Sequence, residues 1–193
     1  MGKLGRKTFA AREDLIDGAN KVAKQKGYTL YAFVNEILHL TLQAEDMDLS
    51  LRTLIEERGL LKAAKEASLV LGLESLWYEM CDLVYEKAKR RTLNCWIEAG
   101  AWMAKNYISS GVNDPFSVFK RDFKAFTWNA SELDIKEEKG KVLIRIISPR
   151  FSESYTFLLS AFLESVLKTF GFTGFKNDVT RGTIRISAHK GKS

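Results

Sequence analysis

The stretch that decides the N-terminal fold is KTFAAREDLIDGANKVAKQKGYTLYAFVNEILHLTL, residues 7–42. Apolar residues recur there at helical spacing in two runs, from Leu15 to Ala23 and from Leu30 to Thr41, which predicts two amphipathic helices. Gly27 separates the runs, and a glycine just past the last turn commonly ends a helix. Thr29 follows, and threonine is a favourable N-cap residue. The stretch therefore predicts a helix, a turn and a second helix.

The residues before the first helix predict a short strand from Arg6 to Ala11. Side chains of a strand alternate between its two faces. With Phe9 and Ala11 turned toward a core, Arg6, Thr8 and Ala10 lie on the opposite face. A lone strand and two short helices cannot enclose a core. We therefore expect this module to need a second copy of itself.

This strand-helix-helix pattern resembles the ribbon-helix-helix DNA-binding module of the MetJ/Arc/CopG type. Glu13, Asp14 and Leu15 stand where that family opens its first helix, and Gly27 to Thr29 stand where it turns. Residues 33–38 stand where its second helix packs across the dimer. The resemblance implies that two strands form an antiparallel ribbon in the major groove of DNA, where a β-ribbon can read base edges.

The resemblance also implies a role for individual residues. The predicted base-reading residues are Arg6, Thr8 and Ala10. The predicted phosphate-binding groups are Lys7, Thr29 and the backbone amides of Leu30 and Tyr31 at a helix N-terminus. The predicted dimer core consists of Phe9, Leu15, Phe33, Val34 and Ile37. Lys7 and Ala10 depart from the family pattern, which usually has an apolar residue at the first position and a longer polar residue at the second.

The whole chain is expected to have an α+β fold in three parts. Residues 1–45 form the ribbon-helix-helix module, residues 46–112 form a mostly helical connector, and residues 113–193 form a C-terminal α+β domain. The acidic run at residues 45–48 suits a linker, and glycine and proline between residues 109 and 115 break the helical pattern.

The C-terminal domain is expected to contain strand, strand, helix and strand. The predicted elements are strands at 133–136 and 141–148, a helix capped by Ser152 or Ser154, and a strand at 182–188. Residues 142–147 are apolar on both faces of their strand, which predicts cover on two sides. We expect this domain to oligomerise or to hold an effector.

Composition excludes several classes of function. A chain of 193 residues that is 46% hydrophobic and 28% charged is typical of a folded globular protein. No phosphate-binding or dinucleotide-binding glycine motif occurs. We therefore expect that the protein is not an enzyme and that it binds no cofactor. Cys81, Cys95, His39 and His189 are too few and too scattered for a zinc site. Without a signal sequence or an apolar span, we expect a cytoplasmic location and no membrane contact.

The charge pattern favours a polyanionic partner. Residues 1–44 carry a net +3 and residues 139–193 a net +7, whereas the segments between them are acidic. Basic surfaces also occur on proteins that bind no nucleic acid, so it is the family resemblance that implies a sequence-specific transcriptional regulator, which binds double-stranded DNA as a homodimer or a higher homo-oligomer. Two alternatives remain open: an antitoxin-like protein that binds another protein, and a small-molecule-binding protein whose N-terminal module only dimerises.

Overall fold

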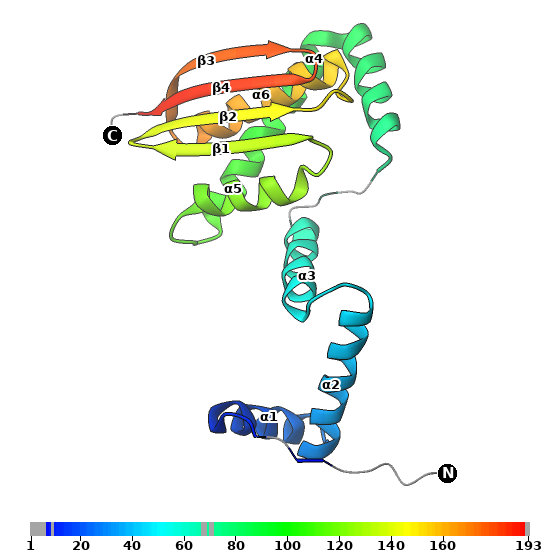
Figure 1. Ribbon diagram of the computed structural model, residues 1–193. Helices are drawn as coiled ribbons and strands as arrows, with labels where there is room; N and C mark the ends of the chain where they lie inside the picture. The colour runs from blue at the N-terminus through cyan, green and yellow to red at the C-terminus, as the bar shows by residue number, and fades with distance from the viewer. Residues whose placement is uncertain (1–6, 9, 67–68, 70–71, 192–193) are drawn as a thin grey trace. The chain divides into compact units, whose positions relative to one another are not determined.

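The computed structural model describes residues 7–8, 10–66, 69 and 72–191. Over these residues the protein is α+β, with six helices and one four-stranded antiparallel sheet (Figure 1). The chain divides into two compact units, residues 1–59 and residues 60–193. We describe each unit by itself. The domain boundaries near residues 45 and 112 stay predictions.

The N-terminal unit contains α1 (Glu13–Gln25), α2 (Leu30–Asp46) and the first half of α3 (Leu51–Glu66). The turn between α1 and α2 follows the predicted signals. Gly27 has a positive φ of 74°, which glycine adopts without strain. The hydroxyl oxygen of Thr29 accepts a hydrogen bond of 3.1 Å from the amide of Ala32, so Thr29 caps α2 as predicted. Ala23 and Ala44 are the two buried hydrophobic residues among those described in this unit.

The predicted N-terminal ribbon is wrong. Among the described residues before α1, Lys7, Thr8 and residues 10–12 belong to no strand. The four strands found in the described chain all follow residue 131. A strand is held by hydrogen bonds to a neighbouring strand, and no described segment of the chain pairs with this one. The described N-terminal region that does form regular structure is helical, from Glu13 to Glu66.

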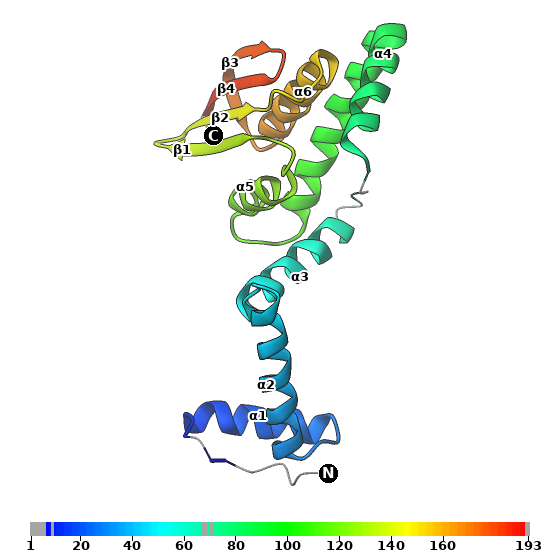
Figure 2. The same ribbon diagram turned by 45° about the vertical axis from the view of Figure 1, so that its right-hand side comes forward.

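The C-terminal unit is a sheet covered by helices. Its elements after α3 are α4 (Glu74–Ser109), α5 (Pro115–Phe126), β1 (Glu132–Glu138), β2 (Lys141–Ile147), α6 (Glu153–Thr169), β3 (Phe172–Thr180) and β4 (Thr183–Lys190). The strands are ordered β1-β2-β4-β3, each antiparallel to its neighbours. Helix α6 lies against one face of the sheet, and α4 packs on the far side of α6 (Figure 2).

Alternation along the central strands places the core on the α6 side of the sheet. Ile144 of β2 pairs with Ile186 of β4, Ile146 pairs with Ile184, and all four side chains are fully buried. Leu143 points to the opposite face and is 47% exposed. Within the described chain no helix covers this second face of β2, and its cover by a second subunit or a ligand stays a prediction. Burial of one face is sufficient for an antiparallel sheet, because such sheets commonly leave their other face exposed to solvent.

The sequence analysis missed two elements of the C-terminal unit, helix α5 and strand β3. The residues of β3, FTGFKNDVT, are mostly polar and contain a glycine, so they carry a weak strand signal. Gly171 ends the helix before it with a φ of 85°. The pairing with β4 is irregular between Thr173 and Lys176, which marks a bulge. From residue 113 onward the order is therefore helix, strand, strand, helix, strand, strand.

Helices α4 and α6 approach each other closely. A Cβ atom at Gly100 of α4 would overlap the backbone carbonyl oxygen of Phe162 on α6. Ala104 is fully buried one turn further on. The hydroxyl of Ser165 donates a hydrogen bond of 2.6 Å to the carbonyl oxygen of Ile97. Small residues thus set the distance between the two helices.

Candidate nucleic-acid interface

The residues predicted to contact bases precede α1. Thr8 and Ala10 are exposed, and so is Lys7, which was predicted to contact phosphate. Arg6 and Phe9 lie outside the described residues. The structure thus shows an exposed non-helical segment in front of α1 that carries a cation.

The other predicted phosphate-binding groups gather at the beginning of α2. Thr29 and Tyr31 are exposed, and Leu30 is half-buried. The side-chain oxygen of Thr29 accepts its bond from Ala32 and still has its own proton to donate. The N-terminal end of a helix carries a partial positive charge that favours anions. These groups therefore share one solvent-facing helix end.

Helix α1 adds cations that the sequence analysis did not assign. Lys21, Lys24 and Lys26 are exposed around its C-terminal half. Among the described residues, none of these three lysines has a carboxylate within ion-pair distance. Arg12 differs, because its Nε donates a 3.0 Å hydrogen bond to Asp14 and holds the pKa of that carboxyl below its usual range. Lys21 and Lys24 are therefore available to an outside anion, while the ammonium of Lys26 lies 5.8 Å from the centre of the Phe33 ring.

Charge is segregated along the N-terminal unit. Residues 1–28 contain seven basic and three acidic residues, a net charge of +4. Residues 29–59 contain two basic and six acidic residues, a net charge of −4. A polyanion is therefore attracted to the end of the unit that contains α1 and repelled by the end that contains the second half of α2 and α3.

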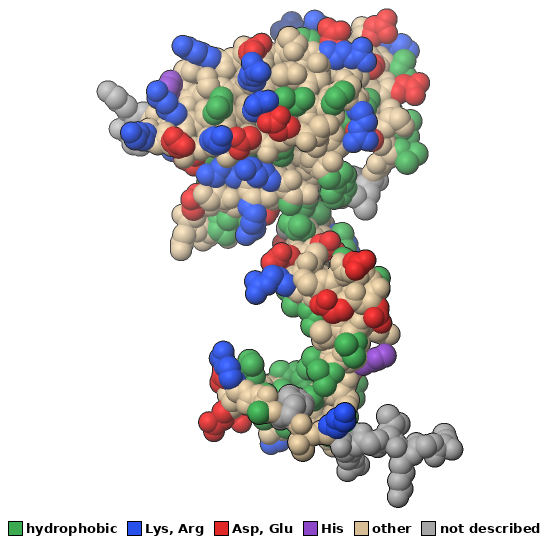
Figure 3. All heavy atoms as spheres, viewed as in Figure 1, with side chains coloured by type: hydrophobic (Ala, Val, Ile, Leu, Met, Phe, Trp, Pro, Cys, Tyr) green, Lys and Arg blue, Asp and Glu red, His purple; other side chains and the backbone are tan. Residues whose placement is uncertain are grey.

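The predicted dimer core is uncovered in the single chain. Leu15 is 59% exposed and Ile37 is 40% exposed, while Phe33 and Val34 are half-buried. Further apolar side chains of the unit are also exposed, as the space-filling view shows (Figure 3). They are Val22, Tyr28, Tyr31, Leu38, Leu40, Leu42, Met47, Leu51, Leu54 and Ile55. Large exposed apolar patches commonly mark interaction sites.

The exposed face of the C-terminal sheet is less suited to a polyanion, although residues 139–193 are basic. Arg145 forms an ion pair of 3.1 Å with Glu132 on the neighbouring strand. Lys136 forms one of 3.0 Å with Asp134. Cations and carboxylates consequently alternate across this face (Figure 3). The N-terminal unit is thus the better candidate for a nucleic-acid interface.

The described part of the C-terminal unit has two hollows. A 280 Å³ apolar pocket is lined by α4 residues between Trp77 and Trp96. A second hollow of 470 Å³ is lined by Tyr85, Glu86, Lys89, Glu153, Ser154 and Phe157. Arg91 of the first pocket belongs to the basic run at residues 87–91, whose sequence favours a solvated helix face over a second nucleic-acid contact. Nothing in that run signals the pocket.

Metal-ligating side chains do not cluster in the described part of the chain. No group of three or more His, Cys, Asp or Glu residues there could hold a metal ion. His39 and His189 are exposed. Cys81 is buried and Cys95 is exposed, and both are free thiols.

Two further findings concern membrane-spanning helices and similarity to known proteins. No helix in the described ranges is long and apolar enough to cross a membrane. No protein family, curated protein or solved structure matches this chain. The functional assignment therefore rests on the residues of the chain itself.

Proposed function

We propose that this chain is a sequence-specific DNA-binding transcriptional regulator that binds DNA through a dimer of its N-terminal unit. The observation that carries the proposal is the segregation of charge on that unit. Residues 1–28 carry a net charge of +4 and residues 29–59 a net charge of −4. The C-terminal unit has a complete core of its own and is free to serve another role.

The proposed dimer is supported by the apolar surface of α1 and α2. Leu15, Phe33, Val34 and Ile37 form its centre, and the buried side chains of one copy are only two alanines. Removing apolar surface from water contributes about 25 cal/mol per Å². Pairing two copies of this surface therefore stabilises the helices that one copy leaves marginal.

The proposed DNA contacts are of two kinds. Lys21, Lys24 and Lys26 contact phosphates, because they are exposed and have no ion-pair partner in the described chain. The segment around Thr8 contacts bases as an arm that follows a groove, since an arm in front of a helix needs no strand partner. Phosphate contacts position a protein on DNA and base contacts specify the sequence, so mutations of the two kinds must behave differently.

The phosphate contacts are tested with two charge-matched triple variants of the full chain. One carries Lys21→Gln, Lys24→Gln and Lys26→Gln. Its control removes three exposed lysines of the C-terminal unit, Lys139, Lys141 and Lys176, by the same change. Binding to duplex DNA is measured over a salt series, in which each lost phosphate contact reduces the slope of log affinity against log salt by about 0.9.

The first variant is expected to lower affinity for all sequences and to flatten the salt slope, whereas the control retains both. Equal losses in the two variants contradict the proposal, because they show a diffuse response to net charge. Sequence specificity is tested by selection from random DNA with the wild type and with Thr8→Ala. A wild type that selects no sequence disproves specific regulation.

A further inference from the structure

The first half of α4 has apolar side chains on two faces. Tyr78 and Cys81 are buried in the core that α4 shares with α6. Five large apolar side chains elsewhere on this half of the helix are 48–52% exposed, and we call them the outer face of α4. They are Leu76, Trp77, Met80, Leu83 and Val84. A helix segment that is apolar on most sides is normally buried, so the outer face lacks the cover that its composition favours.

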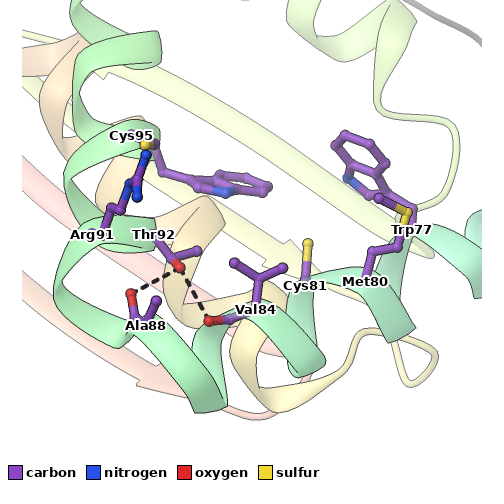
Figure 4. A pocket seen from close by; sticks show the side chains of 9 residues that line it. Trp77, Met80, Cys81, Val84, Ala88, Arg91, Thr92 and Cys95 are labelled. Atoms are coloured by element: carbon purple, nitrogen blue, oxygen red, sulfur yellow. Dashed lines mark hydrogen bonds between the residues drawn. The ribbon is translucent and has the colours of Figure 1, made fainter.

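The outer face forms one continuous stripe. Its members follow one another at intervals of three and four residues, which places them on the same side of a helix. Trp77, Met80 and Val84 point to the same side in the close view (Figure 4). They also line the open hollow of 280 Å³, whose surface is almost wholly apolar. Exposed apolar surface of this extent commonly marks an interaction site.

The stripe ends at a bend of α4. Ala88 interrupts the helix with φ −144° and ψ 46°, which are not helical values. The hydroxyl of Thr92 donates to the carbonyl oxygens of Val84, at 3.3 Å, and Ala88, at 3.0 Å (Figure 4). A side chain that enters the backbone ladder is a recognised cause of a helix kink. At this bend the apolar outer face gives way to the basic run at residues 87–91.

Charge is polarised along the same stretch of α4. Residues 74–86 contain four acidic residues and no basic one, whereas residues 87–91 contain four basic residues and no acidic one. Two of the carboxylates, Glu79 and Glu86, are exposed, and so are all four basic side chains. Within the described chain none of these six exposed side chains forms an ion pair, although the ammonium of Lys89 lies 5.2 Å from the centre of a tyrosine ring.

An antiparallel pair of such segments brings opposite charges together. An interface with two-fold symmetry uses the same patch on both copies, so the patch must be complementary to itself. When two copies of α4 run in opposite directions, the acidic stretch of each copy faces the basic run of the other, and the apolar stripes meet between them. A parallel pair would instead place like charges side by side, which is unfavourable.

We propose that the outer face of α4 binds the outer face of a second copy of this chain in antiparallel orientation. Burial of the five apolar side chains supplies the attraction, and the polarised charge selects both the partner and the direction of pairing. The proposal does not depend on DNA binding or on the proposed N-terminal dimer, since residues 74–91 belong to the C-terminal unit.

The test separates this interface from the proposed N-terminal dimer. All variants are full-length chains that carry Leu15→Glu and Ile37→Glu, which place charges on the exposed apolar surface of α1 and α2. Sedimentation equilibrium measures self-association, and we expect this background to form dimers. A monomeric background overturns the proposal about α4. A background that associates as strongly as the wild type supports it and contradicts the N-terminal dimer instead.

Charge reversal tests the direction of pairing. One variant carries Glu79→Lys and Glu86→Lys, and a second carries Lys87→Glu and Arg90→Glu. Each variant alone should associate more weakly by about tenfold or more, because like charges then face each other twice. An equimolar mixture of the two should regain association, and so should a chain that carries all four changes, since opposite charges face each other again.

The matched control for charge carries Glu98→Lys and Glu138→Lys. Both residues are exposed, form no ion pair in the described chain and lie outside residues 74–91. This control should associate as the background does. An equal loss in the control, or no recovery in the mixture and in the chain with four changes, overturns antiparallel pairing.

Two apolar positions of matched exposure test the location. Met80 is 48% exposed in the middle of the outer face, and Leu143 is 47% exposed on the open face of the sheet. Met80→Glu should abolish dimer formation, whereas Leu143→Glu should not, and the circular dichroism spectrum of each variant verifies its fold. Retention of association in Met80→Glu overturns the proposal, and a loss confined to Leu143→Glu assigns the contact to the sheet.

Discussion

The two units of this protein bury their apolar residues to very different extents. In the C-terminal unit, α6 and the sheet enclose a continuous core that includes Ile144, Leu158 and Leu163, all fully buried. In the N-terminal unit, the buried hydrophobic residues are Ala23 and Ala44, and much larger side chains face solvent. The C-terminal unit therefore has a complete hydrophobic core within one chain, whereas the N-terminal unit exposes the large apolar side chains that a core would bury. Under the proposed function, a second copy of the N-terminal unit covers these side chains.

The largest expected contrast comes from truncating one leucine in each unit. Leu163→Ala removes a fully buried side chain and should lower the free energy of unfolding of the C-terminal unit by about 2–5 kcal/mol. Leu15→Ala removes a side chain that is 59% exposed in one copy. It should leave the free energy of unfolding of the C-terminal unit unchanged and weaken self-association. Denaturant unfolding and light scattering measure the two effects. A loss of C-terminal stability in Leu15→Ala contradicts the division into independent units.

Replacing two glycines with alanine should change stability by smaller amounts and in opposite directions. Gly100→Ala forces a methyl group against the carbonyl oxygen of Phe162 and should destabilise the C-terminal unit by about 1–3 kcal/mol. Gly18 lies within α1 with nothing within 4 Å of an added Cβ. Gly18→Ala should therefore stabilise α1 by about 0.4–1 kcal/mol, because it restricts the unfolded chain. Thermal unfolding of both variants provides the measurement, and a stabilised Gly100→Ala disproves the close approach of α4 and α6.

The smallest expected effect concerns two threonines of α2. Thr29→Ala removes the N-cap bond to Ala32 and should cost the N-terminal unit about 1 kcal/mol. Thr41→Ala is the control, because the Thr41 hydroxyl only bonds the carbonyl oxygen of Ile37 within the helix, a bond that adds little to helix stability. Helicity followed by circular dichroism during dilution compares the variants. If both variants lose helicity equally, the cap is not what stabilises α2.

Local signals explain what the sequence predicts well. The ends of α1 and α2 follow from Gly27 and Thr29, which act within one or two turns. The β1-β2 hairpin follows from Lys139 and Gly140, whose φ angles of 48° and 74° both suit a tight turn. Each of these features depends on residues that are close together in the sequence.

Features that depend on distant partners escape prediction. Strand β3 is polar, and it is a strand because β4 pairs with it. The predicted N-terminal ribbon is wrong because it also depends on a distant partner. Alternating apolar and polar residues favour a strand, but they do not provide the second strand with which it must pair. The pocket depends on the bend at Ala88 and on the packing of Trp96 against α6. Neither the bend nor this packing has a sequence motif. From the sequence alone, Trp77 is therefore predicted to be a core residue and Arg91 a surface residue.

The most direct test of the central claim is hydrogen exchange of the full-length protein across a dilution series, read by peptide mass. Dilution dissociates a dimer, so a unit that folds only as a dimer loses protection as protein concentration falls. We predict that peptides of α1 and α2 lose protection on dilution, while peptides of α6 and β4 keep it. Equal protection of α1 and α2 at every concentration would show that the N-terminal unit is stable alone and would contradict the claim.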